Sequence, residues 1–88
     1  MNFLAKIHVN YKPSVLDPKA EAIKTALTRM SMDNVSSVLY GKYFELELTA
    51  DSATAANTQV DRICDELLAN VNMETYRFEL EEQSEVRE

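Results

Sequence analysis

Apolar and polar residues alternate along the first part of the chain, from residue 3 to residue 11. Alternation with a period of two is typical of a strand that buries one face. The pattern therefore predicts a strand over residues 3–11. One face carries Phe3, Ala5, Ile7, Val9 and Tyr11, and the opposite face carries Leu4, Lys6, His8 and Asn10.

A helix is predicted to begin at Pro18. Asp17 is a good N-cap residue, and proline fits the first helical position because its missing N–H would have no partner there. Apolar residues then recur at helical spacing on one stripe, at Ala22, Ile23, Ala26, Leu27 and Met30. A single stripe of this kind is expected to face a core.

The second half of the chain predicts another helix and another strand. The helix is expected over residues 52–70, with Asp51 or Ser52 as its N-cap. Its apolar stripe is the strongest periodic signal in the chain and comprises Ala53, Ala56, Val60, Ile63, Cys64, Leu67 and Leu68. Residues 74–80 alternate again and predict a strand, with Tyr76, Phe78 and Leu80 on one face.

Gly41 is the only glycine, and it lies between two extended runs, residues 35–40 and 43–49. With Lys42 it would form a two-residue loop. Glycine in the first position of such a loop is typical of a type II′ turn, which needs positive φ there. The sequence therefore predicts a β-hairpin at this point.

The predicted order of elements is βαββαβ. Because each helix has one apolar stripe, both helices should pack on the same face of one sheet. The sequence thus predicts an α+β fold, a ferredoxin-like two-layer sandwich with a four-stranded antiparallel sheet and two helices on one face. A single domain over residues 1–80 is expected, followed by a flexible acidic tail over residues 81–88.

The predicted hairpin places Tyr40 opposite Tyr43, and paired side chains share a face. The inward set would be Phe44, Leu46 and Leu48 with Val35, Ser37 and Leu39, which sends Val38, Tyr40 and Tyr43 outward. An exposed aromatic patch usually meets another protein. Val38, Tyr40 and Tyr43 are therefore candidate self-association residues. The alternative is that the tyrosine pair only stiffens the hairpin.

Composition limits the classes of partner. Apolar residues make up 45% and charged residues 27% of the 88 residues, which is typical of a globular domain. The net charge of −6, concentrated in the last ten residues, argues against a nucleic-acid surface. No apolar run is long enough to span a membrane, and the alternating start is unlike a signal peptide. A cytoplasmic protein is expected.

No catalytic, cofactor-binding or metal site is expected. His8 has no cysteine or serine partner suggested by the sequence, and Cys64 falls within the apolar stripe of the second helix, where burial makes a thiol inert. One glycine cannot build a glycine-rich phosphate loop. Tyr43 invites comparison with RNA-recognition strands, but Glu45 and Glu47 would share its face and repel phosphates.

Three segments resemble one family in order and spacing: "SVLDPKAEAIKTAL", "VSSVLYGKYFELEL" and "ICDELLANVNMETYRFEL". The family is PurS, the small subunit of phosphoribosylformylglycinamidine synthase, and the resemblance covers residues 4–80. The chain departs from the family at Ala20, where a glycine is common, and at Val71 and Asn72, where a proline is usual. Alanine is a better helix former than glycine, so the first departure leaves the fold unaffected.

The resemblance implies a non-catalytic structural role in purine biosynthesis. In this family a glutaminase subunit (PurQ) releases ammonia and a synthetase subunit (PurL) uses ATP, Mg²⁺ and glutamine-derived ammonia to convert FGAR to FGAM. The small subunit joins the two as a homodimer or tetramer and supports ammonia transfer, with no cofactor of its own. Lys42, Asn70 and Glu74 are candidate docking residues for the partner subunits.

Two other classes share the predicted strand order. One is a stand-alone regulatory module of ACT-like type that binds a small molecule, although such domains usually have a glycine near the first turn. The other is a small enzyme of acylphosphatase type, which needs an arginine-lined anion site in the first loop. Lys12 is the only cation that this loop offers.

Overall fold

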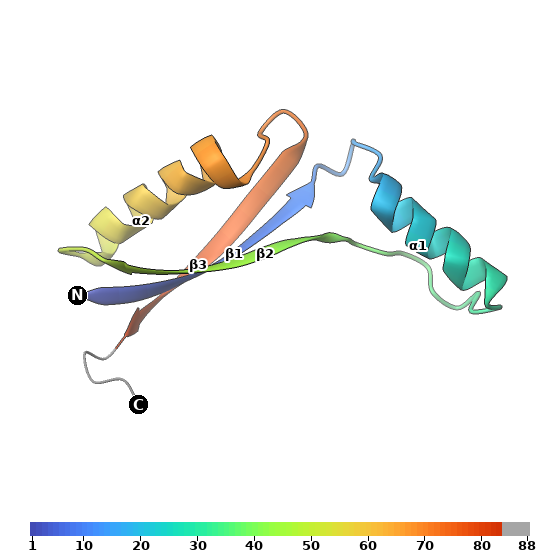
Figure 1. Cartoon of the computed structure of the whole chain (residues 1–88), viewed down its shortest axis with the longest axis horizontal. Helices are drawn as coiled ribbons and strands as arrows, with labels where there is room; N and C mark the ends of the chain where they lie inside the picture. Colours follow the sequence, from blue (N-terminus) through green and yellow to red (C-terminus); the bar gives the residue numbers. More distant parts are fainter. Residues whose placement is uncertain (84–88) are drawn as a thin grey trace.

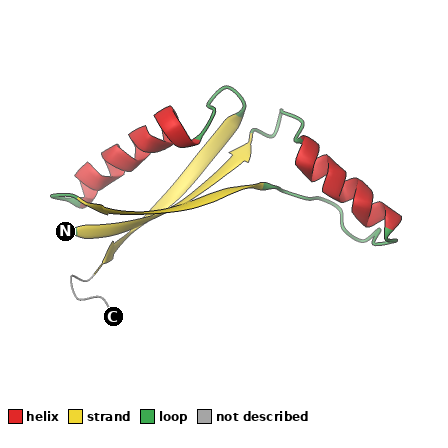
Figure 2. Ribbon diagram, in the orientation of Figure 1, coloured by secondary structure: helices red, strands yellow, loops and turns green. Residues whose placement is uncertain are grey.

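The structure is a computed structural model that describes residues 1–83. Figures 1 and 2 show a twisted sheet with the second helix lying along it and the first helix beyond its end. The elements are β1 (Asn2–Tyr11), α1 (Pro18–Arg29), β2 (Gly41–Thr49), α2 (Ala53–Ile63), the π-helix η1 (Cys64–Leu68) and β3 (Glu74–Gln83). Among residues 1–83, no helix is long and apolar enough to cross a membrane.

The sheet is antiparallel, and its strand order is β2-β1-β3. The central strand, β1, pairs along its length with both neighbours; Ile7, for example, lies opposite Phe44 on β2 and Phe78 on β3. The α+β class and the antiparallel pairing are confirmed. The described part of the chain forms three strands, however, and the four-stranded sheet predicted from the sequence is not present in it.

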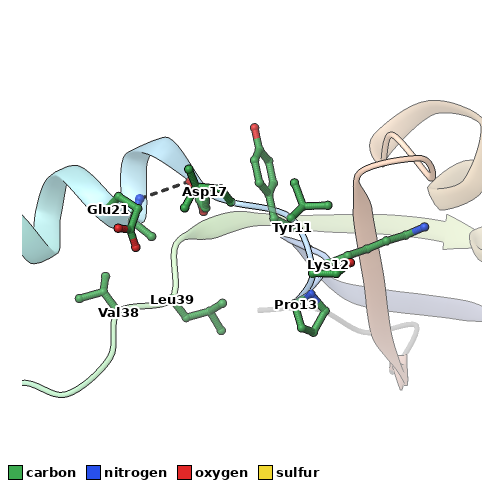
Figure 3. Close-up of a pocket in the computed structure, with 11 residues that line it drawn as sticks. Tyr11, Lys12, Pro13, Asp17, Glu21, Val38 and Leu39 are labelled. Atoms are coloured by element: carbon green, nitrogen blue, oxygen red, sulfur yellow. Dashed lines mark hydrogen bonds between the residues drawn. The ribbon is translucent and has the colours of Figure 1, made fainter.

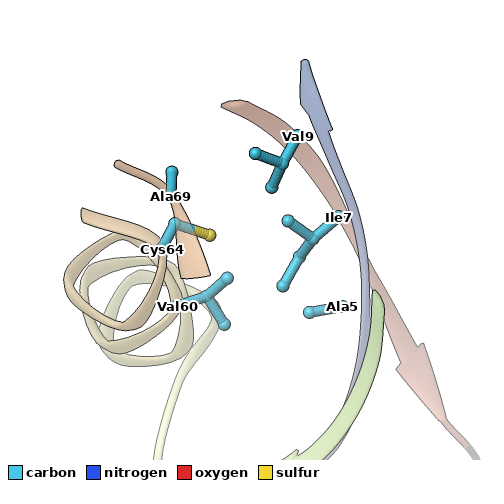
Figure 4. Close-up of a cluster of buried hydrophobic side chains, with 6 residues drawn as sticks. All are labelled: Ala5, Ile7, Val9, Val60, Cys64 and Ala69. Atoms are coloured by element: carbon cyan, nitrogen blue, oxygen red, sulfur yellow. The ribbon is translucent and has the colours of Figure 1, made fainter. Parts of the chain in front are cut away.

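The core lies between β1 and the second helix. Figure 4 shows Val60 and Cys64 facing Ile7 and Val9 across this layer. Val60, Cys64, Ile7 and Val9 are all 0% exposed. Around them the partly buried residues are Phe44, Leu46, Leu48, Leu68, Tyr76, Phe78 and Leu80. The strand faces predicted from alternation are therefore correct, because the period of two ties every side chain on a strand to one face.

The predicted hairpin at Gly41 is wrong. Residues 35–40 form no strand, and β2 begins at Gly41 itself, which lies opposite Asn10 of β1. Tyr43 accordingly pairs with His8 and not with Tyr40. The sequence pairs residues 43–49 with the nearest extended run, residues 35–40. In the structure they pair with β1, which offers a longer ladder of residue pairs and a buried apolar face.

Gly41 is required for a different reason from the one predicted. No glycine in the described residues has positive φ, so the type II′ turn is also absent there. A Cβ atom at Gly41 would lie 2.1 Å from Asn10 Nδ2 and 2.5 Å from the carbonyl oxygen of Val9. Close backbone approach, and not turn geometry, therefore excludes a side chain at this position.

Helix α1 begins where the sequence predicted. The Asp17 carboxylate accepts hydrogen bonds from the backbone N–H groups of Lys19 at 3.0 Å and Ala20 at 3.3 Å. The predicted packing of this helix on the sheet is wrong. Figure 1 shows α1 projecting away from the sheet, and Ala20 is its only buried residue. The apolar stripe of α1 that the sequence predicted to face the core is therefore mostly exposed.

The described part of the chain is consequently extended. Its radius of gyration is 17.0 Å, compared with about 12 Å for a compact domain of this length. Its shortest dimension is 15 Å and its longest is 51 Å. A single helix on a three-stranded sheet, with a second helix held out as an arm, explains these dimensions.

Strand β3 is longer than predicted. It continues to Gln83, and Glu81, Glu82 and Gln83 pair with Leu4, Phe3 and Asn2 respectively. Residues 81–83, predicted as the start of a flexible tail, therefore belong to the sheet. Residues 84–88 of that predicted tail lie outside the described residues.

Tyr76 connects the second helix to β3. Its hydroxyl donates a hydrogen bond to the Asp61 carboxylate at 2.8 Å. That hydrogen bond, followed by burial and the negative charge of Asp61, raises the pKa of Tyr76 to about 12. The contact favours the neutral phenol in the folded state.

We predict that Gly41→Ala lowers the free energy of unfolding by about 1–3 kcal/mol, because the new Cβ collides with backbone as well as side-chain atoms. Urea unfolding followed by circular dichroism measures the change. The double variant Asn10→Ala, Gly41→Ala should recover part of the loss relative to Asn10→Ala alone. A single variant as stable as the wild type would contradict the close approach.

We predict a pH dependence at the alkaline end. The unfolded state releases the Tyr76 proton near its ordinary pKa of about 10, and the folded state releases it at about 12. The contribution to stability is therefore complete below pH 10 and is lost as the pH rises through 12. Absorbance titration should show a tyrosinate component near pH 12 that Tyr76→Phe removes and Tyr40→Phe leaves in place.

Candidate functional site

Lys42, Asn70 and Glu74, the three docking candidates from the sequence, lie together in the structure. Lys42 on β2 forms an ion pair with Glu74 at the start of β3, with Nζ and Oε2 3.3 Å apart. The other oxygen of Glu74, Oε1, accepts a hydrogen bond from the backbone N–H of Asn70 at 2.8 Å. The sequence alone did not indicate that these residues meet.

Glu74 is the buried member of this group. It is 9% exposed, and it is the only buried polar or charged residue in the described chain. A buried carboxylate is costly unless its oxygens have partners, and both oxygens have one here. Lys42 Nζ also donates to the carbonyl oxygen of Leu68 at 3.5 Å. The cluster therefore ties β2, the end of the second helix and the start of β3 together.

The second helix does not continue as an α-helix to residue 70, as predicted. After Ile63 it widens into the π-helix η1, and the backbone N–H of Ala69 donates to the carbonyl oxygen of Cys64 at 2.9 Å. The wider turn changes the direction of the side chains. Leu68 packs against the core, whereas Leu67 is 77% exposed. The predicted burial of Leu67 is thus wrong.

Cys64 packs in the core, as the sequence predicted. It is 0% exposed and has no disulfide partner. Burial raises the pKa of the Cys64 thiol, and the nearby charge of Asp61 raises it further. A thiol in this environment stays protonated and serves as a small apolar side chain.

Tyr43 lies on the sheet face opposite α2, as predicted. Its ring centroid is 4.8 Å from that of His8, and its hydroxyl donates to Glu45 Oε2 at 2.8 Å. The hydrogen bond to Glu45 and then burial raise the pKa of Tyr43. The same face carries an ion pair of 2.7 Å between Lys6 and Glu81. This face therefore carries paired charges beside the two rings.

Val38 and Tyr40 do not share that face, because the hairpin that would have placed them there does not form. Tyr40 lies beside the start of α1, where Lys19 Nζ donates to its hydroxyl at 3.3 Å and sits 5.1 Å from the ring centroid. The three predicted self-association residues therefore lie on two surfaces. Tyr43 belongs to the open sheet face, and Val38 and Tyr40 belong to the segment that leads from α1 into β2.

Val38 and Leu39 border an open hollow of about 450 Å³. Figure 3 shows Tyr11, Lys12 and Asp17 on its other sides, between the end of β1 and the start of α1. Residues 1–83 contain no group of three or more His, Cys, Asp or Glu side chains that could hold a metal ion.

The comparison with known proteins gives a consistent result. Residues 4–82 match the family described as PurS: Phosphoribosylformylglycinamidine (FGAM) synthase. The chain is 43% identical over 79 residues to the phosphoribosylformylglycinamidine synthase subunit PurS of a Synechocystis strain, covering 90% of this chain and 79% of that protein. The PurS subunit of Bacillus subtilis is 40% identical over 80 residues, with 91% and 94% covered.

Solved structures agree with this result. The B. subtilis PurS structure in its C2 crystal form has a TM-score of 0.80 at 40% identity, covering 91% of this chain and 99% of that chain. A chain in the structure of PurLQS from Thermotoga maritima has a TM-score of 0.82 at 31% identity, covering 91% and 98%. The fold of this chain is therefore similar to that of these experimental structures. The chain belongs to the PurS family of phosphoribosylformylglycinamidine synthase.

Proposed function

We propose that this chain is the non-catalytic structural subunit of a phosphoribosylformylglycinamidine synthase complex, in which it joins the glutaminase subunit (PurQ) to the synthetase subunit (PurL). The observation that carries the proposal is its likeness, over nearly its whole length, to PurS chains, one of them from a PurLQS structure. The complex uses ATP, Mg²⁺ and glutamine to convert FGAR to FGAM in the cytoplasm. This chain supplies contact surfaces and binds none of the three.

The physical properties of the chain support a bridging role. Ammonia released into neutral water is mostly protonated and then no longer a nucleophile, so its transfer needs a closed path between two active sites. A bridging subunit must offer surfaces to more than one neighbour. Large apolar side chains are exposed here on α1, on the segment before β2 and beyond α2, with Ile23 42%, Leu39 75% and Leu67 77% exposed.

A second copy of the chain is the occupant that fits the exposed helix α1. Its stripe includes Ile23 and Met30, which are 42% and 60% exposed. On the sheet, Phe44, Leu46 and Leu48 of β2 face the same side as α2 and are only partly buried, because one helix covers that side. The α1 helix of a second copy can lie there beside α2 and complete the two-layer arrangement. Exchange of one element between identical chains is a low-cost route to a dimer.

The candidate residues from the sequence fit two interfaces and not one. Val38 and Tyr40 lie on the segment that carries α1, so they would join the exchanged contact. Tyr43 lies with His8 on the open sheet face, where a further contact between dimers would cover it. A tetramer built as a dimer of dimers with D2 symmetry requires a second interface of this kind, whereas a dimer uses the first alone.

We predict that glutamine-dependent FGAM synthesis by the PurL and PurQ subunits requires this chain. Synthesis from added ammonium chloride should continue without it, because the synthetase site then receives ammonia from solution. The two rates, measured with and without the chain, separate a bridging role from a catalytic one. Equal glutamine-dependent rates in both mixtures would remove the proposed function.

We predict that Ile23→Asp converts the free protein to monomers, because it places a charge in the centre of the α1 stripe. The matched control is Thr25→Asp, which adds the same charge to the same helix about half a turn away. Sedimentation velocity measures the oligomeric state, and circular dichroism checks that the sheet is intact. An unchanged oligomer in Ile23→Asp would contradict contact through α1.

A further inference from the structure

The segment that leads from α1 into β2 has the composition of a strand but pairs with nothing in its own chain. We call residues 35–40 the donor segment, and their sequence is VSSVLY. It contains no glycine, proline or charged residue, and valine and tyrosine favour strands. Within residues 1–83, no hydrogen bond reaches the backbone of residues 36–39. An exposed segment of this kind readily pairs with another strand.

The outer edge of β2 offers a complementary surface. The strand order β2-β1-β3 leaves β2 paired with β1 on one side only. The nine residues of β2 include no proline and its ladder has no bulge, and these are the devices that usually protect an edge. Edge strands present a row of free N–H and C=O groups. A further strand at this edge would complete the four-stranded sheet that the sequence predicts.

The chain does not place its own donor segment on this edge. That would need a tight turn at Gly41 and Lys42, but both residues belong to the ladder with β1. Gly41 lies opposite Asn10, and Asn10 Nδ2 donates to the carbonyl oxygen of Tyr40 at 3.3 Å. Figure 1 shows the chain entering β2 without reversing its direction. A strand at the free edge must therefore come from another chain.

The side chains of the donor segment alternate in phase with those of β2. Tyr40 lines a hollow of about 240 Å³ with Val9 and Lys42, so it lies on the α2 side of the sheet. Alternation then places Val38 on the same side and Leu39 on the other. Figure 3 shows Val38 and Leu39 pointing to different sides of the segment. Beside a second copy of β2, Val38 and Tyr40 would extend its partly buried apolar row.

A second copy of the chain is the occupant that fits this edge. Residues 12–40 carry both α1 and the donor segment, so one exchange brings a helix to the sheet face and a strand to the sheet edge. Each copy has one donor segment and one free edge, and reciprocal exchange therefore closes a symmetric dimer. The donor segment is uncharged, so it brings no like charge to Glu45 and Glu47 of β2.

We propose that residues 35–40 of a second copy add to the free edge of β2 as an antiparallel fourth strand, while the first copy supplies the same strand in return. The inference rests on the second copy proposed above for α1 and adds the contact that the strands make. It does not depend on PurL or PurQ. The four-stranded sheet predicted for one chain is then assembled from two.

Proline substitution tests the strand pairing separately from the α1 contact. In an edge strand the N–H groups of alternate residues point to the neighbouring strand, and the others point to solvent. Proline removes one N–H group. Of the variants Ser36→Pro and Ser37→Pro, one therefore loses a hydrogen bond between copies and the other is its matched control.

We expect the dissociation constant of self-association to rise about tenfold or more in one of these two variants and to stay near the wild-type value in the other. Sedimentation equilibrium of the full chain measures both constants. Circular dichroism of the two variants should match the wild type, because the backbone of residues 36–39 has no hydrogen bond within residues 1–83.

Amide hydrogen exchange gives a second measurement on the unmodified chain. At concentrations that populate the oligomer, the amides of residues 36–39 should be protected at every second position. Dilution to the monomer should remove the protection. A dimer held together by α1 alone would leave all four amides exchanging rapidly.

Each outcome bears on the inference. Equal self-association of the two proline variants, rapid exchange of all four amides in the oligomer, or a wild-type chain that stays monomeric overturns the strand exchange. Protection that appears only after PurL and PurQ are added assigns the edge to a different subunit and also overturns it. The proposed function stands in all of these cases, because the glutamine-dependent and ammonium-dependent rates decide it.

Discussion

The double pairing of β1 is the interaction on which the rest of the structure depends. Its apolar face, Ala5, Ile7 and Val9, is fully buried, and its backbone is hydrogen bonded on both sides to antiparallel neighbours. A strand in this position has no free edge and cannot change register without moving its core residues to the open face. Both neighbouring strands and the second helix take their positions from it.

The core that forms around β1 is small, and its size has consequences for the surface. One helix, anchored by Val60 and Cys64, covers one side of the sheet, so the apolar residues of β2 on that side stay partly exposed. Helix α1 forms on local grounds, through its Asp17 cap, and yet has no sheet beneath it. A chain of this length buries a limited fraction of its surface alone, and association is the usual remedy. Helix α1 and strand β2 each leave an apolar surface exposed, so contact between the two in an assembly would cover both.

The change from α-helix to π-helix at Cys64 links the core to the surface. One additional residue in the turn brings Leu68 and not Leu67 to the core, and Lys42, which pairs with Glu74, donates to the carbonyl oxygen of Leu68. The packing of Leu68 and the exposure of Leu67 are thus decided by the same few residues. A subunit without catalytic groups acts through its contact surfaces. The shape of those surfaces therefore determines what it can bind.

The sequence by itself determined the features that depend on local periodicity. The phase of each strand that forms, the N-cap at Asp17, the burial of Cys64 and the outward position of Tyr43 follow from spacing and side-chain chemistry over a few residues. The same chemistry narrowed the N-cap of the second helix to Asp51 or Ser52, and the structure shows Ser52. The family resemblance was also readable, because it rests on short segments in a fixed order. Only the tertiary structure decided which strand pairs with residues 43–49 and where α1 lies. It also decided that a side chain at position 41 has no room and that Lys42 reaches Glu74. An extended run can pair with any strand whose apolar face matches its own. The alternative pairings differ in the length of the loop that they close, and this difference changes the free energy of loop closure only slightly. The choice therefore depends on the whole core, which no local pattern contains.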